Sequence, residues 1–559
     1  MKNIHLLKKI QGLRKKNMTF KDRFLLAIIA LGFILLIFLI FYVIWYAYSQ
    51  RSVAHFLPAE QTVAYVEFED FVLPTKLQST TELAKQEVEN NIKTVFGIED
   101  MSAITNWAGA RFGITLIQSD EEISTPVFFI QTRSRHKAVS FFEGLALPEE
   151  KLEKTGTLRL PIYSYPQSQS FNFAFVGPFV FISNEISPLE AIQDTFEDEA
   201  LAISDQEDYR KSISNLPRQS WMRGYINFQA LHFENIAASN IVEPLKYAVN
   251  HLAWTVRQNQ NGFHFNTFIN LNKDLLELNE SFADDTRFAY KLTDYIGSEN
   301  LALYIGGANL SDEWQNTLET ISNLNPAYGI ILESIIRAQV SKVFGDEVNL
   351  RNDLYPLFEG EYALAIGLDE ESEKINLSLI LSHDNQEFVE TKLEKLMDGF
   401  RYLAAQFAPK LNIVTLPDGT ESRELIADSS KLEESSEEYE GYDVNCMEVT
   451  GTSGGFCYTT TDELLVITNS RDLTLEAVDL SMSPQFVLSQ YQPFRQAISN
   501  LSKVSDELTF VDIQRILPLI SNNPYGIIAE PFLNKFDAIS WVKHYFDDGV
   551  SVEGYLLIK

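Results

Sequence analysis

Long stretches of the chain alternate apolar and polar residues with the period of β-strands. In the clearest examples, at 113–132 and 363–382, two such runs follow one another closely, as they do in β-hairpins. Other segments have the spacing of amphipathic helices, at 80–95, 235–249 and 387–400. Hairpins separated by helices predict an α+β fold, with a mostly antiparallel sheet and helices packed on one of its faces.

One segment departs from this pattern because it is apolar throughout. Residues 24–48 carry no charge, and these 25 residues would form a helix about 37 Å long. That length exceeds the hydrocarbon core of a bilayer, about 30 Å, so the segment predicts one N-terminal transmembrane helix. Aromatic residues gather at its far end, where a membrane interface would lie. They are Phe41, Tyr42, Trp45, Tyr46 and Tyr48.

The two flanks of this segment differ in charge. Residues 1–23 hold eight Lys and Arg against one Asp, whereas the whole chain has 45 Lys and Arg against 77 Asp and Glu. The positive-inside rule therefore predicts a basic cytoplasmic tail, with the bulk of the chain extracytoplasmic. A cleaved signal peptide has a shorter apolar stretch, of about 7 to 15 residues, so we expect an uncleaved signal anchor in the cell membrane.

The region after the apolar segment contains similar stretches in the same order. FNFAFVGPFVFISN begins at Phe171 and FCYTTTDELLVITN at Phe456, an offset of 285 residues. Further matches follow in order, as far as Trp254 and Trp541 near the ends of the two series. Ordered matches of this kind indicate an internal duplication.

These matches predict two similar, mostly antiparallel α+β units, at 53–273 and 290–559. The offset between them grows along the chain, which places an insertion in the second unit. The candidate insertion is 427–443, which is acidic and rich in Ser. Such a composition has little to bury and predicts an exposed loop.

Composition narrows the classes of function. The chain has 559 residues, of which 45% are hydrophobic, enough for several domains with sizeable cores. Its formal net charge of -32 argues against nucleic acid as a partner, because phosphate binding needs clustered Lys and Arg. The same charge favours protein or neutral-glycan partners over anionic polymers.

The chain has two cysteines, Cys446 and Cys457, in strand-like runs joined by the turn GTSGG. This arrangement predicts a disulfide across a hairpin, because oxidation is permitted outside the cytoplasm. The alternative is a pair of free, half-buried thiols. We do not expect a zinc site, since no His lies nearby and zinc needs four ligands.

No motif in the sequence predicts catalysis. GTSGG matches G-x-S-x-G with Ser453 at its centre, but strand-like residues on both sides indicate a hairpin tip rather than a nucleophile elbow. The P-loop, zincin and EF-hand patterns are absent from the sequence. The sequence therefore nominates no catalytic, cofactor-binding or metal-binding residue.

Two stretches resemble a known family. LPAEQTVAYVEF from Leu57 and FVFISNEISPLEAI from Phe179 are similar to an uncharacterised bacterial family of membrane-anchored envelope proteins. That family, a "domain of unknown function", opens with an L-P-A strand after one transmembrane helix. The resemblance implies an envelope location but no activity.

We therefore expect a non-enzymatic binding, scaffolding or assembly factor of the cell envelope, with envelope proteins or neutral glycans as partners. The alternative is an enzyme that modifies an envelope polymer, such as a hydrolase whose site is not visible in the sequence.

Overall fold

A computed structural model gives the fold of most of the chain after residue 50. The described residues are 51–69, 102–118, 124–145, 152–156, 160–164, 171–231, 248–259, 261–272, 290–324, 326–369, 374–407, 410–417, 419–426, 432–450, 455–502, 505–521, 530, 533–546 and 549–559.

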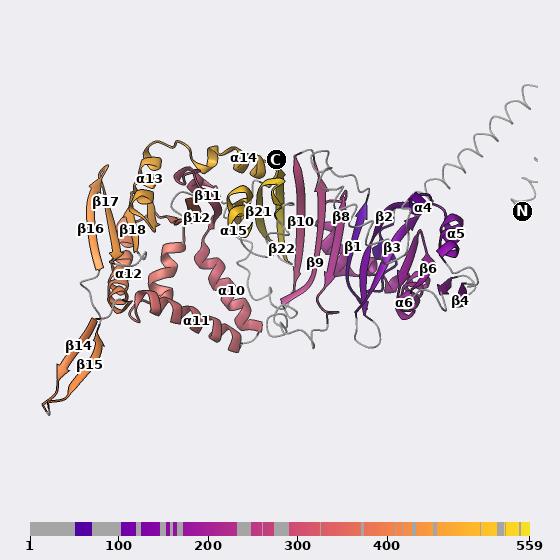
Figure 1. Ribbon diagram of the computed structural model, residues 1–559, viewed down its shortest axis with the longest axis horizontal. Coiled ribbons are helices and arrows are strands. Elements are labelled where there is room, and N and C mark those ends of the chain that lie inside the picture. The colour runs from indigo at the N-terminus through magenta and orange to yellow at the C-terminus, as the bar shows by residue number, and fades with distance from the viewer. Residues whose placement is uncertain are drawn as a thin grey trace, which may run out of the picture.

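The strands come in two series. The first series is β1 (Thr62–Glu69), β2 (Ala108–Gln118), β3 (Ser124–Thr132), β4 (Glu153–Gly156), β5 (Pro161–Ser164), β6 (Asn172–Val176), β7 (Phe179–Ser183), β8 (Met222–Asn227), β9 (Val249–Gln258) and β10 (Gly262–Leu271). The second is β11 (Leu301–Ala308), β12 (Glu361–Asp369), β13 (Lys374–Ser382), β16 (Leu432–Tyr439), β17 (Tyr442–Val449), β18 (Gly455–Thr460), β19 (Leu464–Thr468), β20 (Glu507–Asp512), β21 (Phe536–Phe546) and β22 (Gly549–Ile558). A separate hairpin, β14 (Lys410–Thr415) and β15 (Glu421–Ile426), projects from the body (Figure 1).

All twenty strands of the two series belong to one antiparallel sheet. The first half pairs in the order β4-β5-β6-β7-β3-β2-β1-β8-β9-β10. The second half pairs in the order β16-β17-β18-β19-β13-β12-β11-β20-β21-β22. The two orders correspond strand by strand, so the described chain contains the same ten-strand arrangement twice. Trp254 on β9 and Trp541 on β21 lie on equivalent strands.

The two halves meet where β10 pairs with β22 in the middle of the sheet (Figure 1). Nine residue pairs are in register along this seam, from Gly262 opposite Leu557 to Asn270 opposite Gly549. The Tyr555 hydroxyl also donates a hydrogen bond of 2.9 Å to Asn259 Oδ1, from the second half to the first. The seam therefore has both a complete strand ladder and a side-chain contact.

The helices of the first half are α4 (Ser102–Thr105), α5 (Arg135–Leu145), α6 (Ser187–Glu197) and α7 (Glu207–Ser214), with the 3₁₀-helices η1 (Val53–His55), η3 (Glu199–Leu201) and η4 (Ile203–Asp205). Those of the second half are α10 (Leu310–Leu324), α11 (Pro326–Phe344), α12 (Gln386–Phe407), α13 (Arg471–Met482), α14 (Gln492–Ile498) and α15 (Ile513–Ser521). They are joined by the 3₁₀-helices η6 (Lys291–Tyr295), η8 (Tyr355–Phe358) and η10 (Leu488–Gln490) and by one π-helical turn, η7 (Leu350–Leu354).

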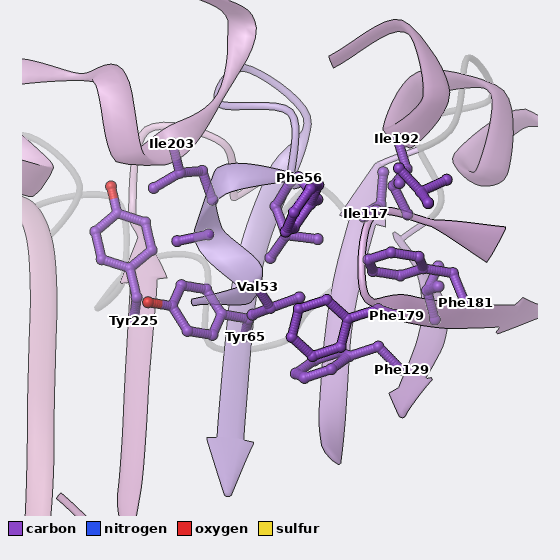
Figure 2. Packing of buried hydrophobic residues seen from close by; sticks show 14 of the residues in the cluster. Val53, Phe56, Tyr65, Ile117, Phe129, Phe179, Phe181, Ile192, Ile203 and Tyr225 are labelled. Carbon is purple, nitrogen blue, oxygen red and sulfur yellow. The ribbon is translucent and has the colours of Figure 1, made fainter. Parts of the chain in front are cut away.

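Both faces of the sheet carry helices, in contrast to the one-sided arrangement that the sequence predicted. In the first half, Phe129 and Phe181 face a core shared with η1, α6 and α7, where their rings pack around Phe179 (Figure 2). Their neighbours Val180 and Ile182 face a second core beneath α5. The reason is that all five residues of β7 are buried, and a strand that is apolar on both faces must be covered on both.

The predicted fold class needs a further correction. The β10–β22 seam joins the strands of both series into one sheet, a pairing that the prediction of two units did not address. The predicted transmembrane segment, 24–48, and its aromatic residues lie outside the described residues. None of the helices that the structure does describe is long and apolar enough to cross a membrane.

Length alone does not make a membrane span, as α11 illustrates. It has 19 residues but carries Glu333, Arg337 and Lys342, charges that a bilayer core disfavours. The fold class with a membrane-spanning helix is therefore not supported, and neither is the membrane anchor derived from it. The unit boundaries at 53–273 and 290–559 stay a prediction.

The acidic stretch of the second half differs from the expected loop. Residues 427–431 lie outside the described residues, but 432–439 form β16 and 442–449 form β17. β16 pairs with β17 at the edge of the sheet, and most of its side chains are exposed. An edge strand can carry an acidic sequence because charges there discourage pairing with another chain.

The seam predicts the effect of a small substitution at Gly554 on β22. A Cβ added at Gly554 would lie 1.8 Å from Cζ of Phe265 on β10, so the ring would have to leave the seam. We expect Gly554→Ala to lower the free energy of unfolding by about 1–3 kcal/mol, the usual cost of overpacking. Chemical denaturation of the purified chain measures this. Ser551→Ala, on the same strand, is the control, and equal stability of both variants would contradict the prediction.

An apolar cavity as the candidate functional site

Three helices cover one face of the sheet in the second half. α10 begins after Asn309 and α12 after Asn385, and the side chain of each Asn accepts a hydrogen bond from a backbone N–H of the first helical turn. Between α11 and the sheet runs the segment formed by η7 and η8. Asn349 caps η7 in the same way, with hydrogen bonds of 3.0 Å from the amides of Arg351 and Asn352.

This cover leaves two adjoining hollows with apolar walls, both partly open to solvent. The outer chamber, of about 370 Å³, lies between α10, α11 and the η7–η8 segment. Its walls include Leu310, Trp314, Ile336, Leu350 and Tyr355. The inner chamber, of about 260 Å³, lies between α12 and strands β13, β18 and β19. Its walls include Leu379, Leu393, Met397, Phe456 and Ile467.

The two chambers share two wall residues, Leu354 and Phe358. Both side chains are only partly buried, although they belong to the hydrophobic core beneath α12. They stand between the chambers as a partition.

The equivalent layer of the first half is closely packed. Beneath α5, the rings of Phe142 and Phe173 stack with their centroids 4.2 Å apart, and Tyr163 stacks on Phe173 at 4.8 Å. Phe142 and Phe173 are 2% and 0% exposed. The same fold therefore closes this layer in one half and leaves it hollow in the other.

Smaller side chains explain the difference between the halves. Phe142, the eighth residue of α5, is matched by Leu393, the eighth residue of α12. Phe175 on β6 is matched by Thr460 on β18, since each lies opposite the equivalent residue of the next strand, Val180 or Leu465. The second half thus lacks ring volume at two matched positions.

An empty cavity of this kind is costly. Protein interiors leave few voids larger than a water molecule. The apolar walls of the inner chamber lack part of the contacts that a packed core would give them, and an apolar occupant would supply those contacts.

Asp353 anchors the η7–η8 segment to α12. Its side chain accepts hydrogen bonds from the amino groups of Lys392 and Lys395 and from the Asn349 amide. Burial acts to raise the pKa of Asp353, but the hydrogen bonds from Lys395 and Asn349 outweigh it, so the pKa lies below its ordinary value. The ionised Asp353 therefore fixes the wall that carries Leu354 and Phe358.

Tyr355 lines the outer chamber together with Trp314. Its hydroxyl is buried beside the Trp314 side chain, which interacts with it. Burial raises the pKa of Tyr355, so the hydroxyl stays protonated at neutral pH.

The sequence-predicted residues lie elsewhere. Cys446 and Cys457 form a disulfide between directly opposed residues of β17 and β18, which confirms the predicted bond. Ser453 and most of the GTSGG turn lie outside the described residues. No cluster of His, Cys, Asp and Glu suited to a metal occurs among the described residues. The cavity itself was missed, since nothing in a single strand or helix pattern indicates a hollow core.

Comparison with known proteins gives a family without a function. The model of a family described as "Protein of unknown function (DUF3352)" matches residues 75–406, which includes parts of both halves. No curated protein matches the chain.

Crystal forms I and III of TP0453 are similar solved structures, with 9% and 10% identity and a TM-score of 0.23 each. Each similarity covers 40% of this chain and 80% of the other chain. So low a structural similarity supports no conclusion about this chain.

Two matched isoleucines test whether the inner chamber is hollow. Ile467 on β19 lines the chamber, and Ile182 on β7 occupies the equivalent place in the packed first half, where it is 5% exposed. We expect Ile467→Phe to leave stability unchanged or raise it by about 0.5–2 kcal/mol, because the ring fills space. Ile182→Phe should lower stability by about 1–3 kcal/mol through overpacking. Thermal and chemical unfolding of both variants measure this, and an equal loss in both would refute the hollow chamber.

The anchor at Asp353 predicts a dependence on pH. Its folded pKa lies below the ordinary 3.8, so its stabilisation is complete above that pH and disappears as the pH falls through the folded value. We expect Asp353→Asn to cost about 1–3 kcal/mol at pH 7, with the difference from the native chain vanishing in acid. Unfolding measured across this range tests it. Asp346→Asn, at an exposed position, is the control, and a pH-independent difference for Asp353→Asn would contradict the assignment.

Proposed function

Because the chain belongs to the DUF3352 family, whose function is unknown, we propose a function from its cavity: a non-enzymatic, extracytoplasmic binding protein for an elongated apolar ligand. The ligand class is a hydrocarbon chain with one polar end. The hydrocarbon chain of the ligand occupies the two chambers.

The difference between the two matched halves carries this proposal. Both halves have the same strand order, yet among the residues that the structure describes the layer beneath α12 is hollow, whereas the layer beneath α5 is closely packed. Ligand pockets commonly measure about 300–1,000 Å³ and are mostly apolar with a few placed polar groups. The two chambers, of about 370 and 260 Å³, together fall within that range, and both have apolar walls.

The disulfide supports the extracytoplasmic part of the proposal. Disulfides persist in oxidising compartments and are rare in the cytoplasm. The bond between Cys446 and Cys457 is buried, with the two residues 5% and 1% exposed, so it belongs to the folded core rather than to an exposed redox switch. A binding or assembly role among envelope components is compatible with that location.

The proposal predicts binding of a neutral apolar probe. We expect 1-aminoanthracene to fluoresce on binding to the purified chain, and straight-chain alcohols to displace it with an affinity that rises with chain length. Each methylene that enters the cavity should contribute about 0.8 kcal/mol, until the cavity is filled. Fluorescence titration gives the affinities.

Two isoleucine variants serve as a matched pair in this assay. Ile467→Phe fills the inner chamber and should weaken binding of long alcohols by about tenfold, or about 1.4 kcal/mol. Ile375→Phe places the same ring on an exposed site of the neighbouring strand β13 and should bind normally. If the Ile467→Phe variant binds the probe and the long alcohols as the native chain does, the proposal is contradicted. Turnover of an ester-linked chain would instead favour the hydrolase alternative.

A further inference from the structure

A polar cleft lies in the first half, at the end of strands β1, β2 and β8. It has a volume of about 390 Å³, and its walls include four arginines. They are Arg51, Arg111, Arg218 and Arg223. In a chain with a net charge of -32, such a grouping of arginines is unexpected from composition.

The strand register builds this cleft. On β1, Tyr65, Glu67 and Glu69 point to the same face, because side chains alternate along a strand. Tyr65 belongs to the apolar core, whereas Glu67 and Glu69 continue the same row into the cleft. Arg223 on β8 lies directly opposite Glu67, and Arg111 on β2 lies directly opposite Glu69.

The two carboxylates are occupied by contacts within the protein. Glu67 is 5% exposed and accepts hydrogen bonds from the Ser52 hydroxyl at 2.7 Å and the Val53 amide at 3.3 Å. It thereby holds the start of η1. Glu69 pairs with Arg111 at 3.0 Å, and Arg111 also donates to the carbonyl of Arg51. Arg111 is thus a fixed part of the wall.

Two of the arginines have N–H groups for which the described residues supply no acceptor. Arg218 is exposed, and its guanidinium forms no hydrogen bond or ion pair with the parts of the chain that the structure describes. Arg223 uses one nitrogen to donate to the Arg218 carbonyl, at 3.1 Å, while its buried Nε has no partner among the described residues. A buried donor without a partner is costly, so this nitrogen favours an acceptor that the chain does not supply.

The second half shows that the fold itself does not require the cleft. Through the equivalent strand pairs, Glu67 and Arg223 correspond to Gly306 and Leu508. Arg111 corresponds to Glu361, which accepts a hydrogen bond from the Leu292 amide at the start of η6. The second half therefore also has a carboxylate that holds its short helix, but this carboxylate comes from β12 rather than from the strand equivalent to β1. Leu508 takes the place of Arg223. Holding the short helix explains Glu67 but leaves Arg223 unexplained.

We propose that this cleft binds an anionic group, a phosphate or a carboxylate, through the guanidinium groups of Arg218 and Arg223. The planar guanidinium donates paired hydrogen bonds to either group, which share this oxygen geometry. The negative charge of the rest of the chain weakens anion binding only slightly, because salt screens that charge beyond about 8 Å at physiological ionic strength. The site is separate from the apolar cavity and does not depend on it.

Calorimetric titration of the purified chain tests the proposal, with inorganic phosphate in one arm and acetate in the other. The titrations are made at about 0.15 M salt, so that weak, non-specific attraction is screened. We expect saturable binding of at least one anion. The arm with the lower Kd identifies the anionic group.

Arg218→Gln is the main variant, because its exposed side chain has no structural partner to lose. It should weaken binding by about tenfold or more, as expected for a lost charge-assisted hydrogen bond. Arg223→Gln should act in the same direction, with its fold checked by circular dichroism. Arg210→Gln, on α7 outside the cleft, should bind as the native chain does. Absence of saturable binding in both arms, or equal affinity of the Arg218 and Arg210 variants, would overturn the proposal.

Discussion

The pairing of β10 with β22 is the contact on which the rest of the architecture depends. Each half ends in a long strand whose outer edge would otherwise expose a row of unpaired amides and carbonyls. Joining these two edges satisfies both at once and makes one sheet of twenty strands. The main cores of the halves are separate clusters, and a smaller cluster across the seam packs Phe263 against Phe536 and Ile558. The seam thus fixes the halves relative to one another, while the side chains in the core of each half can differ.

Much of the fold could be predicted from sequence because strands and hairpins are local patterns. The antiparallel hairpin of β12 and β13 follows from alternating residues, and the disulfide from two cysteines in neighbouring strands. The joining of the halves could not be predicted, because the sequence of a strand does not indicate which distant strand it pairs with. The acidic sequence of β16 was wrongly predicted to be a loop. A strand at the edge of a sheet can form despite low intrinsic strand propensity, because its side chains can stay exposed.

The candidate sites were harder to predict for a different reason. A cavity is a shortage of side-chain volume, and its walls have the same apolar residues as a packed core. Its one sequence signal is comparative: Phe175 in the first copy stands against Thr460 in the second, within stretches that already align. The polar cleft carries a similar signal, since Arg223 stands against Leu508. Duplication lets one half serve as the reference for the other.

The two halves differ from one another in two places, once in the volume of core side chains and once in charge at the end of a strand. In the second half the core under α12 has lost ring volume, which reduces stability and creates space. In the first half the end of β1 carries Glu67 and Glu69, at positions where β11 has Gly306 and Ala308. Because the seam joins the two copies through backbone hydrogen bonds, these differences in side chains leave the pairing of the halves intact.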